Sequence, residues 1–109
     1  MSHLEIPSGT LDMLVLQTLA RNGSLHGFEI AQAIERTSVD VFRVEEGSLY
    51  PALQRLLIKG FVQAEWGRTS ENRRARYYNL LADGKKHLAR EVQSYRRASI
   101  AIDRILIPA

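Results

Sequence analysis

The chain has 109 residues and no cysteine, with 45% hydrophobic and 25% charged residues and a formal net charge of +3. This length fits one folded domain and leaves no room for a large enclosed active site beside a second module. The lack of cysteine excludes disulfides, thiolate metal ligands and cysteine nucleophiles.

The charge is distributed unevenly along the chain. Residues 1–60 hold five Lys or Arg against seven Asp or Glu, a net charge of −2, whereas residues 61–109 hold ten against five, a net charge of +5. A basic second half favours a polyanionic partner, and an ordinary solvated basic surface is the alternative. Since the sequence has neither a run of roughly 18 apolar residues nor a basic start followed by an apolar segment, we expect a cytoplasmic protein.

Two amphipathic helices are expected in the first third of the chain. The first follows Pro7-Ser8-Gly9 and ends at Asn22-Gly23, because apolar side chains recur between these breakers with a period of about 3.6 residues. The second follows Ser24 and fades by Thr37-Ser38. Residues 39–44 are rich in β-branched side chains, which fits either a short strand or an extended connection.

A third helix is expected after Glu45-Glu46-Gly47-Ser48. Gly60 is placed to end this helix. Pro51 lacks the amide hydrogen that an inner helical turn needs, so its position predicts a helix that starts only two or three residues earlier. The inward stripe comprises Leu49, Ala52, Leu53, Leu56 and Leu57.

The period then changes from about 3.6 to about 2, which indicates a β-hairpin. Residues 62–67 alternate between apolar and polar, a polar tip spans residues 68–74, and residues 75–80 alternate again. Trp66 shares the apolar face of the first strand and is expected in the core, with a role in a ligand site as the secondary alternative.

The last segment, residues 82–107, is expected to form one long helix. A small core covers only part of a helix of roughly 38 Å, so its far end is predicted to pack on a second copy of the chain. The predicted seam resembles a coiled coil and comprises Leu88, Val92, Tyr95, Ser99, Ile102 and Leu106.

The third helix has the features of a DNA-recognition helix. Its outward residues, at about 100° per residue, are Ser48, Pro51, Gln54 and Arg55, with Tyr50 beside them. Gln54 can pair with adenine, Arg55 with guanine or a phosphate, and Ser48 with a phosphate near the helix N-terminus. The alternatives are an ordinary solvent-facing role for each, and packing against its neighbours for Tyr50.

The hairpin tip adds four arginines within nine residues, Arg68, Arg73, Arg74 and Arg76. Arg73 and Arg74 are placed to reach a phosphate backbone or a minor groove. Arg76 lies inside the strand, where pairing with Glu65 across the hairpin is the open alternative.

Five blocks of sequence resemble one known family. They are Gly9-Thr10-Leu11-Asp12-Met13-Leu14-Val15-Leu16, His26-Gly27-Phe28-Glu29-Ile30, Glu46-Gly47-Ser48-Leu49-Tyr50-Pro51-Ala52-Leu53, Glu65-Trp66-Gly67 and Asn72-Arg73-Arg74-Ala75-Arg76-Tyr77-Tyr78. In this order and at these separations they resemble the PadR family of bacterial transcriptional regulators, over residues 4 to about 91. The resemblance implies a winged-helix fold, homodimers joined through the C-terminal helix, and repression of nearby genes at palindromic operators. It also implies that a small aromatic effector lowers DNA affinity, as in many relatives.

The sequence departs from the family pattern at two positions. Leu81 stands where the family usually has the threonine that caps the last helix, so the start of that helix is not fixed by the pattern. Leu57 stands where a charged residue is common. The short C-terminus resembles the subfamily that has a single C-terminal helix.

An enzyme and a protein-docking module are the alternative functions. His3, His26 and His87 show no metal-binding spacing, and the sequence has no phosphate loop or nucleophile elbow. His26 is expected at the start of the second helix, bonded to backbone. A docking module would not need four arginines at the hairpin tip.

We therefore expect a mainly α fold with a small β-hairpin. A winged helix-turn-helix would occupy residues 1–81 and a long C-terminal dimerisation helix residues 82–109. The expected function is regulation of transcription by a homodimer on double-stranded DNA, without catalysis, cofactor, metal or membrane.

Overall fold

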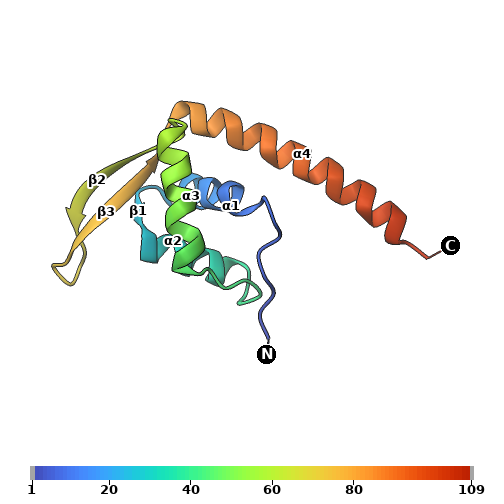
Figure 1. Cartoon of the computed structure of the whole chain (residues 1–109), viewed down its shortest axis with the longest axis horizontal. Helices are drawn as coiled ribbons and strands as arrows, with labels where there is room; N and C mark the ends of the chain where they lie inside the picture. The colour runs from blue at the N-terminus through green and yellow to red at the C-terminus, as the bar shows by residue number, and fades with distance from the viewer. Residues whose placement is uncertain (1, 109) are drawn as a thin grey trace.

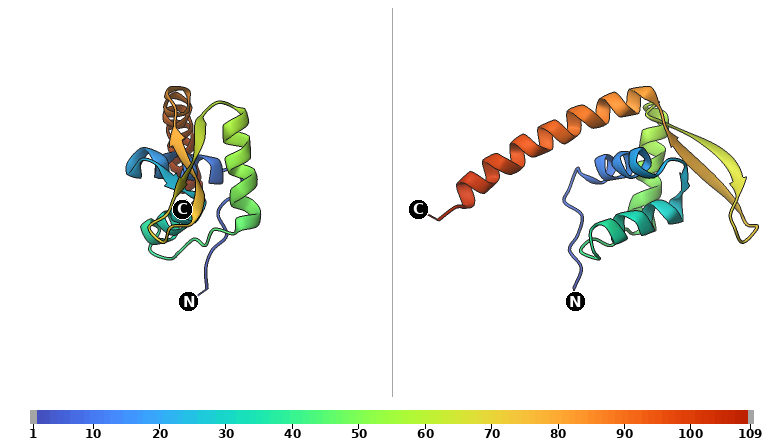
Figure 2. Two further views of the ribbon diagram at one scale, coloured as in Figure 1. Left: turned by 90° about the vertical axis from the view of Figure 1, so that its left-hand side faces the viewer. Right: turned by 180° about the vertical axis from the view of Figure 1, so that it is seen from behind.

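The computed structural model describes residues 2–108, so Met1 and Ala109, the outer ends of the two expected segments, lie outside the description. Its elements are α1 (Leu11–Asn22), β1 (Leu25–His26), α2 (Gly27–Thr37), α3 (Glu46–Ile58), β2 (Val62–Arg68), β3 (Arg74–Leu80) and α4 (Ala82–Leu106). The first three helices form one body, from which the hairpin projects on one side and α4 on the other (Figure 1). The view from behind shows the hairpin and α4 pointing away from the body in opposite directions (Figure 2, right). The expected fold class is confirmed.

One apolar core joins the three helices, the sheet and the start of α4. Each helix contributes side chains spaced three or four residues apart, and full burial of such a side chain stabilises the fold by about 1.5–3 kcal/mol. The predicted inward stripes therefore hold the body together. The main buried members are Val15, Leu16, Leu19, Ile30, Ile34, Leu49, Leu53, Leu56, Val62, Tyr78 and Leu88.

The helix ends follow the local chemistry of the sequence. Gly23 (φ 80°) ends α1 and Gly60 (φ 74°) follows α3, both in the left-handed region that glycine adopts without strain. At the start of α2, His26 Nδ1 accepts a hydrogen bond from the Glu29 amide (3.4 Å), and Glu29 Oε1 accepts one from the His26 amide (3.1 Å). This reciprocal pair confirms the predicted backbone bonding of His26.

The sheet has three antiparallel strands in the order β1-β3-β2, one more than the sequence predicts. The extra strand is β1, in which Leu25 pairs with Tyr78 and His26 pairs with Tyr77. Two residues are too few to show an alternating pattern, so only their pairing with β3 makes them a strand.

Residues 39–44 form a connection with one isolated bridge, between Phe42 and Leu4. Val39 (φ 53°) and Asp40 (φ 61°) adopt left-handed backbone, which interrupts any strand and is uncommon for a β-branched residue. Of the two alternatives left open by the sequence, the structure therefore shows the connection.

Helix α3 begins earlier than Pro51 predicts. It starts at Glu46, which places Pro51 in the second turn. The ring removes one hydrogen bond, to the carbonyl of Gly47, and both residues are exposed, so water can hydrate that carbonyl. The predicted start two or three residues before Pro51 is wrong, because the missing bond faces solvent.

Helix α4 is anchored in the core by its first turns and then leaves it. A Cβ at Gly84 would overlap the Phe61 carbonyl oxygen, so only glycine allows this close approach. Leu88 is buried in the core of its own chain, and Val92 packs against that core. Leu88 is therefore only 7% exposed in the described chain, whereas Tyr95 is 48% exposed. Within residues 2–108, none of the helices has the length and apolar character needed to cross a membrane.

Candidate nucleic-acid interface

The two faces of α3 separate as the periodicity predicts. Leu49, Ala52, Leu53 and Leu56 are buried, and Leu57 is half-buried against the core. The opposite face is exposed and offers hydroxyl, amide and guanidinium groups to a partner. Its members are Ser48, Tyr50, Pro51, Gln54 and Arg55.

Tyr50 links α3 to the start of α2. A Cβ at Gly27 would lie 3.0 Å from the Tyr50 hydroxyl oxygen and 3.2 Å from its Cε1, so the ring packs over the bare Gly27 backbone. The side chain remains 49% exposed. Tyr50 thus both packs against a neighbour and remains at the surface. Gly27, which the sequence did not mark as part of the site, leaves the space that the Tyr50 ring occupies.

Arg55 is held by α1. Its Nη2 lies 2.7 Å from Asp12 Oδ1, and its Nε donates to Asp12 Oδ2 at 3.2 Å, which makes a bidentate pair. The hydrogen bonds to Asp12 and the attraction between the two charges raise the pKa of Arg55. Although Arg55 lies on the predicted outer face, a contact with guanine or phosphate would have to compete with Asp12.

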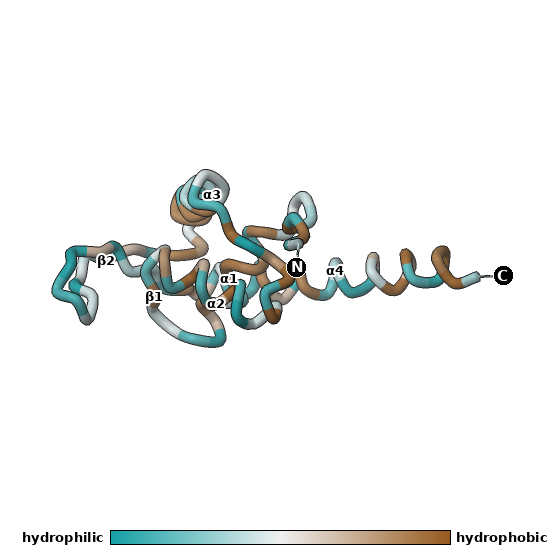
Figure 3. The backbone as a smooth tube through the Cα atoms, turned by 90° about the horizontal axis from the view of Figure 1, so that it is seen from below, coloured by the Kyte–Doolittle hydropathy of each residue, from teal (hydrophilic) through white to brown (hydrophobic). Residues whose placement is uncertain are grey.

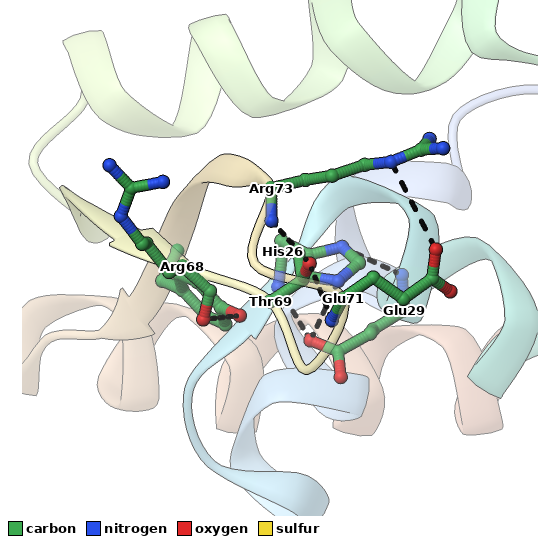
Figure 4. A network of polar contacts seen from close by, with 7 residues as sticks. His26, Glu29, Arg68, Thr69, Glu71 and Arg73 are labelled. Carbon is green, nitrogen blue, oxygen red and sulfur yellow. Dashed lines mark hydrogen bonds and ion pairs between the residues drawn. The ribbon is translucent and has the colours of Figure 1, made fainter.

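A tight turn closes the wing, which we define as β2, β3 and residues 69–73. The Thr69 hydroxyl oxygen accepts hydrogen bonds from the amides of Glu71 (3.3 Å) and Arg73 (3.2 Å). The Thr69 amide donates to the Arg73 carbonyl (2.8 Å), and Asn72 has a φ of 61°. Figure 4 shows Thr69 in the turn beside Glu71 and Arg73. Thr69 therefore orders the arginine-rich tip, a role that the sequence did not reveal.

The pairing of β2 with β3 sorts the wing residues into two faces. Trp66 lies opposite Arg76, Arg68 opposite Arg74, and Glu65 opposite Tyr77. Because neighbouring residues in a strand point to opposite faces, Trp66, Arg68, Arg74 and Arg76 share one face, which we call the arginine face. Glu65 and Tyr77 lie on the other face. The alternative in which Arg76 pairs with Glu65 is therefore wrong.

The expected burial of Trp66 is also wrong. The first residue of β2, Val62, is 2% exposed, whereas Trp66 is 61% exposed. Four residues of strand span about 13 Å, which carries Trp66 past the end of the core even though it stays on the apolar face. Its ring instead receives the Arg74 guanidinium, whose central carbon lies 4.4 Å from the ring centroid.

The other tip arginines have weak intramolecular partners. Arg73 Nε lies 3.9 Å from Glu71 Oε2, and both side chains are more than three-quarters exposed, so this pair contributes little (Figure 4). Arg68 Nη1 donates to the Asn72 carbonyl at 3.2 Å, which leaves its charge unneutralised. The Tyr77 hydroxyl, on the other side of the wing, donates to the Arg68 carbonyl at 3.1 Å.

The base of the wing lies close to α3. Burial raises the pKa of Tyr78 in β3, the neighbouring charge of Arg76 lowers it, and the nearby Tyr50 of α3 raises it. Tyr78 lies in the same apolar core as Leu49 and Leu53 of α3, so the base of the wing packs on the core that this helix covers.

The second half of α4 exposes apolar side chains. In a view coloured by hydropathy, hydrophobic segments recur along this helix beyond the body (Figure 3). Tyr95 and Ile102 of the predicted seam are about half exposed, Leu106 is 72% exposed and Ser99 is intermediate. The exposed isoleucines and leucine near the end are Ile100, Ile102, Ile105, Leu106 and Ile107.

The three histidines contact neighbouring side chains or cap a helix. His87 stacks on Phe61, with ring centroids 4.4 Å apart, and its Nε2 lies 3.2 Å from Glu91 Oε1. His26 caps α2, and His3 Nε2 lies 3.4 Å from Arg43 Nη2. In the part of the chain that the structure describes, no group of three or more His, Asp or Glu side chains could hold a metal ion.

Known proteins share both the sequence pattern and the fold. The model of the "Transcriptional regulator PadR-like family" matches residues 15–90. Protein X of Lysinibacillus sphaericus, described as uncharacterised, is 29% identical over 103 residues, which cover 94% of each chain. A PadR family transcription regulator from Clostridium difficile is similar with a TM-score of 0.76 and 28% identity, covering 91% of this chain and 100% of that chain.

A transcriptional regulator from Clostridium thermocellum shares the fold with a TM-score of 0.82 at 23% identity, covering 91% of this chain and 95% of that chain. The family match covers more than half of the sequence, and it includes α3 and the whole wing. The chain therefore belongs to the PadR-like family of transcriptional regulators.

Proposed function

We propose that the chain is a repressor that binds an operator as a homodimer, with α3 in the major groove and the wing on flanking phosphates or the minor groove. The observation that carries the proposal is the arginine face, on which three exposed arginines share one side of the wing, while α3 separately exposes a polar face. Fixed positive charges beside a polar helix suit a duplex, because phosphate contacts supply affinity and base contacts supply sequence preference. The same geometry gives a protein-docking module no evident use for these charges.

Base reading is proposed for Gln54, which has an exposed amide in the middle of the outer face of α3. An amide can donate to and accept from adenine in the major groove. Ser48, near the helix N-terminus, is proposed to bind phosphate, and Tyr50 and Pro51 to line the groove. Arg55 contributes only when DNA displaces Asp12 from its guanidinium.

Affinity is proposed to come from the wing. Arg68, Arg74 and Arg76 present their charges on one face, and Arg73 extends from the turn with only a weak pair to Glu71. Each phosphate that these side chains neutralise should make binding more sensitive to salt.

Dimerisation is proposed to use the part of α4 that the core leaves exposed. Tyr95, Ser99, Ile102 and Leu106 supply the seam, with Val92 at its inner edge. This assigns residues 82–109 to assembly and residues 1–81 to DNA binding, although the first turns of α4 also complete the core. Two α3 helices placed roughly 34–36 Å apart by such a dimer would meet successive major grooves.

An effector, proposed to be a small aromatic molecule, would act on that spacing. A ligand that binds more tightly to a dimer with the wrong separation of its α3 helices lowers DNA affinity by population shift. Repression of this kind would take place on bacterial DNA in the cytoplasm.

Footprinting and anisotropy titration on the DNA upstream of the protein's own gene test the proposal. We expect one protected, palindromic site and a log–log salt slope of about −0.9 for each neutralised phosphate. A scrambled duplex of the same length and composition is the control for sequence preference. Absence of binding to both duplexes at low ionic strength would contradict the proposal and favour a docking module.

A further inference from the structure

We infer that Trp66 is a positioning residue for DNA binding, whose indole holds the Arg74 guanidinium on the arginine face ready to meet a phosphate. The inference rests on the proposed function, since it identifies the residue that orients Arg74 for the proposed phosphate contact. It gives a function to the Trp66 side chain, which does not contribute to the core.

Trp66 is an unusual surface residue. It is the only tryptophan in the chain, and it is 61% exposed near the end of a hairpin. An indole at such a position gains little from burial and adds an apolar surface to a polar wing. The contact that accounts for its position is the Arg74 guanidinium, 4.4 Å from the ring centroid and within the range of about 6 Å for a cation–π interaction.

Arg74 has no competing partner among residues 2–108. Its strand neighbour across the hairpin is Arg68, another cation. Glu65 lies on the opposite face of the wing, and the Glu71 carboxylate is nearest to Arg73. None of the ion pairs formed by the described residues involves Arg74.

An aromatic ring and a carboxylate can both orient an arginine side chain, but they affect its charge differently. A carboxylate would orient the guanidinium but would also neutralise its charge and occupy its N–H groups, as Asp12 does with Arg55. A ring beneath the guanidinium plane leaves the charge intact and the N–H groups at its edge free to donate. Stacking on Trp66 therefore lowers the entropy that Arg74 would lose on binding a phosphate.

The support beneath Trp66 is itself braced from the other face of the wing. A Cβ at Gly67 would lie 3.0 Å from the Tyr77 ring, so that ring packs against the strand next to Trp66. The Tyr77 hydroxyl bonds to the Arg68 carbonyl, and its ring meets His26 at a centroid distance of 5.3 Å. The wing is thereby tied to the start of α2, which fixes where Trp66 presents Arg74.

The test compares W66F, W66L, R74A and the W66L/R74A double variant by anisotropy titration against operator DNA. Leucine keeps an apolar side chain but has no π face, so W66L should bind about two- to fivefold more weakly, the range for an exposed cation–π pair. The salt slope of W66L should stay at the wild-type value, because the Arg74 charge remains. W66F should recover most of the loss. R74A should weaken binding further and flatten the slope by about 0.9.

The double variant provides the decisive comparison. If Trp66 acts through Arg74, W66L causes no additional loss once Arg74 is alanine. Wild-type affinity in W66L, or equal losses from W66L with and without Arg74, would overturn the inference. Thermal unfolding of W66L should match the wild type, because the side chain is exposed; a large fall in Tm would show a structural role instead. If the wild-type protein binds no DNA, the proposed function fails before Trp66 is tested.

The emission of Trp66 gives a second readout that needs no DNA. As the only tryptophan in the chain, it reports on its own surroundings. R74A should change its emission spectrum in the free protein, whereas R96A, which removes an equal charge from exposed α4, should not. An unchanged spectrum in R74A would show that the stacked contact is not formed in solution.

Discussion

Helix α3 and the wing both expose polar side chains, but they differ in net charge and in whether their arginines are neutralised. α3 contains one arginine and one glutamate, with no net charge, whereas residues 62–80 contain four arginines and two glutamates, a net charge of +2. The α3 cation, Arg55, is neutralised by Asp12, while Arg74 is stacked on an uncharged ring. Under the proposed function, attraction to a duplex is concentrated in the wing, which leaves α3 to discriminate between base sequences.

The largest effect should come from a change that touches neither region. I102E together with L106E places charges in the exposed apolar half of α4 and should prevent association of two copies. Operator affinity should then fall by on the order of a hundredfold or more, because one half-site no longer increases the local concentration of the other. Analytical ultracentrifugation and anisotropy measure the two results. A variant that stays dimeric, or a monomer that binds with wild-type affinity, would contradict the proposed assembly.

R73A together with R74A tests the wing. Loss of two phosphate contacts should weaken binding to operator and scrambled DNA alike, by about ten- to thirtyfold at physiological salt, and flatten the salt slope by about 1.8. R96A on α4 is the matched control for charge. The important outcome is an equal loss of affinity for the operator and the scrambled duplex. A loss confined to the operator would mean that the wing reads bases and that the comparison with α3 is wrong.

Q54A tests α3. Removal of the amide should relax preference at a single base pair, where a good bidentate contact discriminates by about 1–3 kcal/mol, and should leave the salt slope unchanged. Titration against a set of operators with each base pair substituted in turn gives the measurement. The prediction fails if Q54A and the double arginine variant have the same profile over this set.

D12N should have the smallest effect and the opposite sign. It weakens the pair that holds Arg55, an interaction between partly exposed groups that contributes no more than about 1 kcal/mol to stability. With its partner uncharged, Arg55 can reach phosphate, so binding to any duplex should strengthen about two- to fivefold and the salt slope should steepen by up to about 0.9. Weaker binding by D12N would show that Asp12 is needed to place α3 rather than to restrain Arg55.

The sequence predicts the order of elements because each depends on local chemistry. Apolar periods of 3.6 and 2, together with Gly23 and Gly60, mark four helices and two strands of the hairpin, close to their observed bounds except at the start of α3. The same periodicity correctly predicts which face of α3 is exposed. Its errors lie where the local rule lacks information, as at Pro51, whose missing hydrogen bond is tolerated because the Gly47 carbonyl is open to water.

The candidate site was predicted in composition but not in arrangement. The tip arginines and the outer residues of α3 are exposed as expected. Asp12 and Arg55 are 43 residues apart in sequence, and no pattern within either helix indicates that they meet. The alternation of β2 places Trp66 on the apolar face, but it does not show that the core ends before that residue. Only the length of the hairpin relative to the body decides this.

By itself, the sequence determined the helices, the hairpin and the excess of positive charge near its tip, because periodicity, turn residues and charge are properties of neighbouring residues. The tertiary structure alone decided that Leu88 completes the core, that Arg55 is restrained, and that three arginines share a face with Trp66. These outcomes depend on how distant elements pack and on the pairing of two strands. A shift of one residue in that pairing would have placed a different set of side chains together.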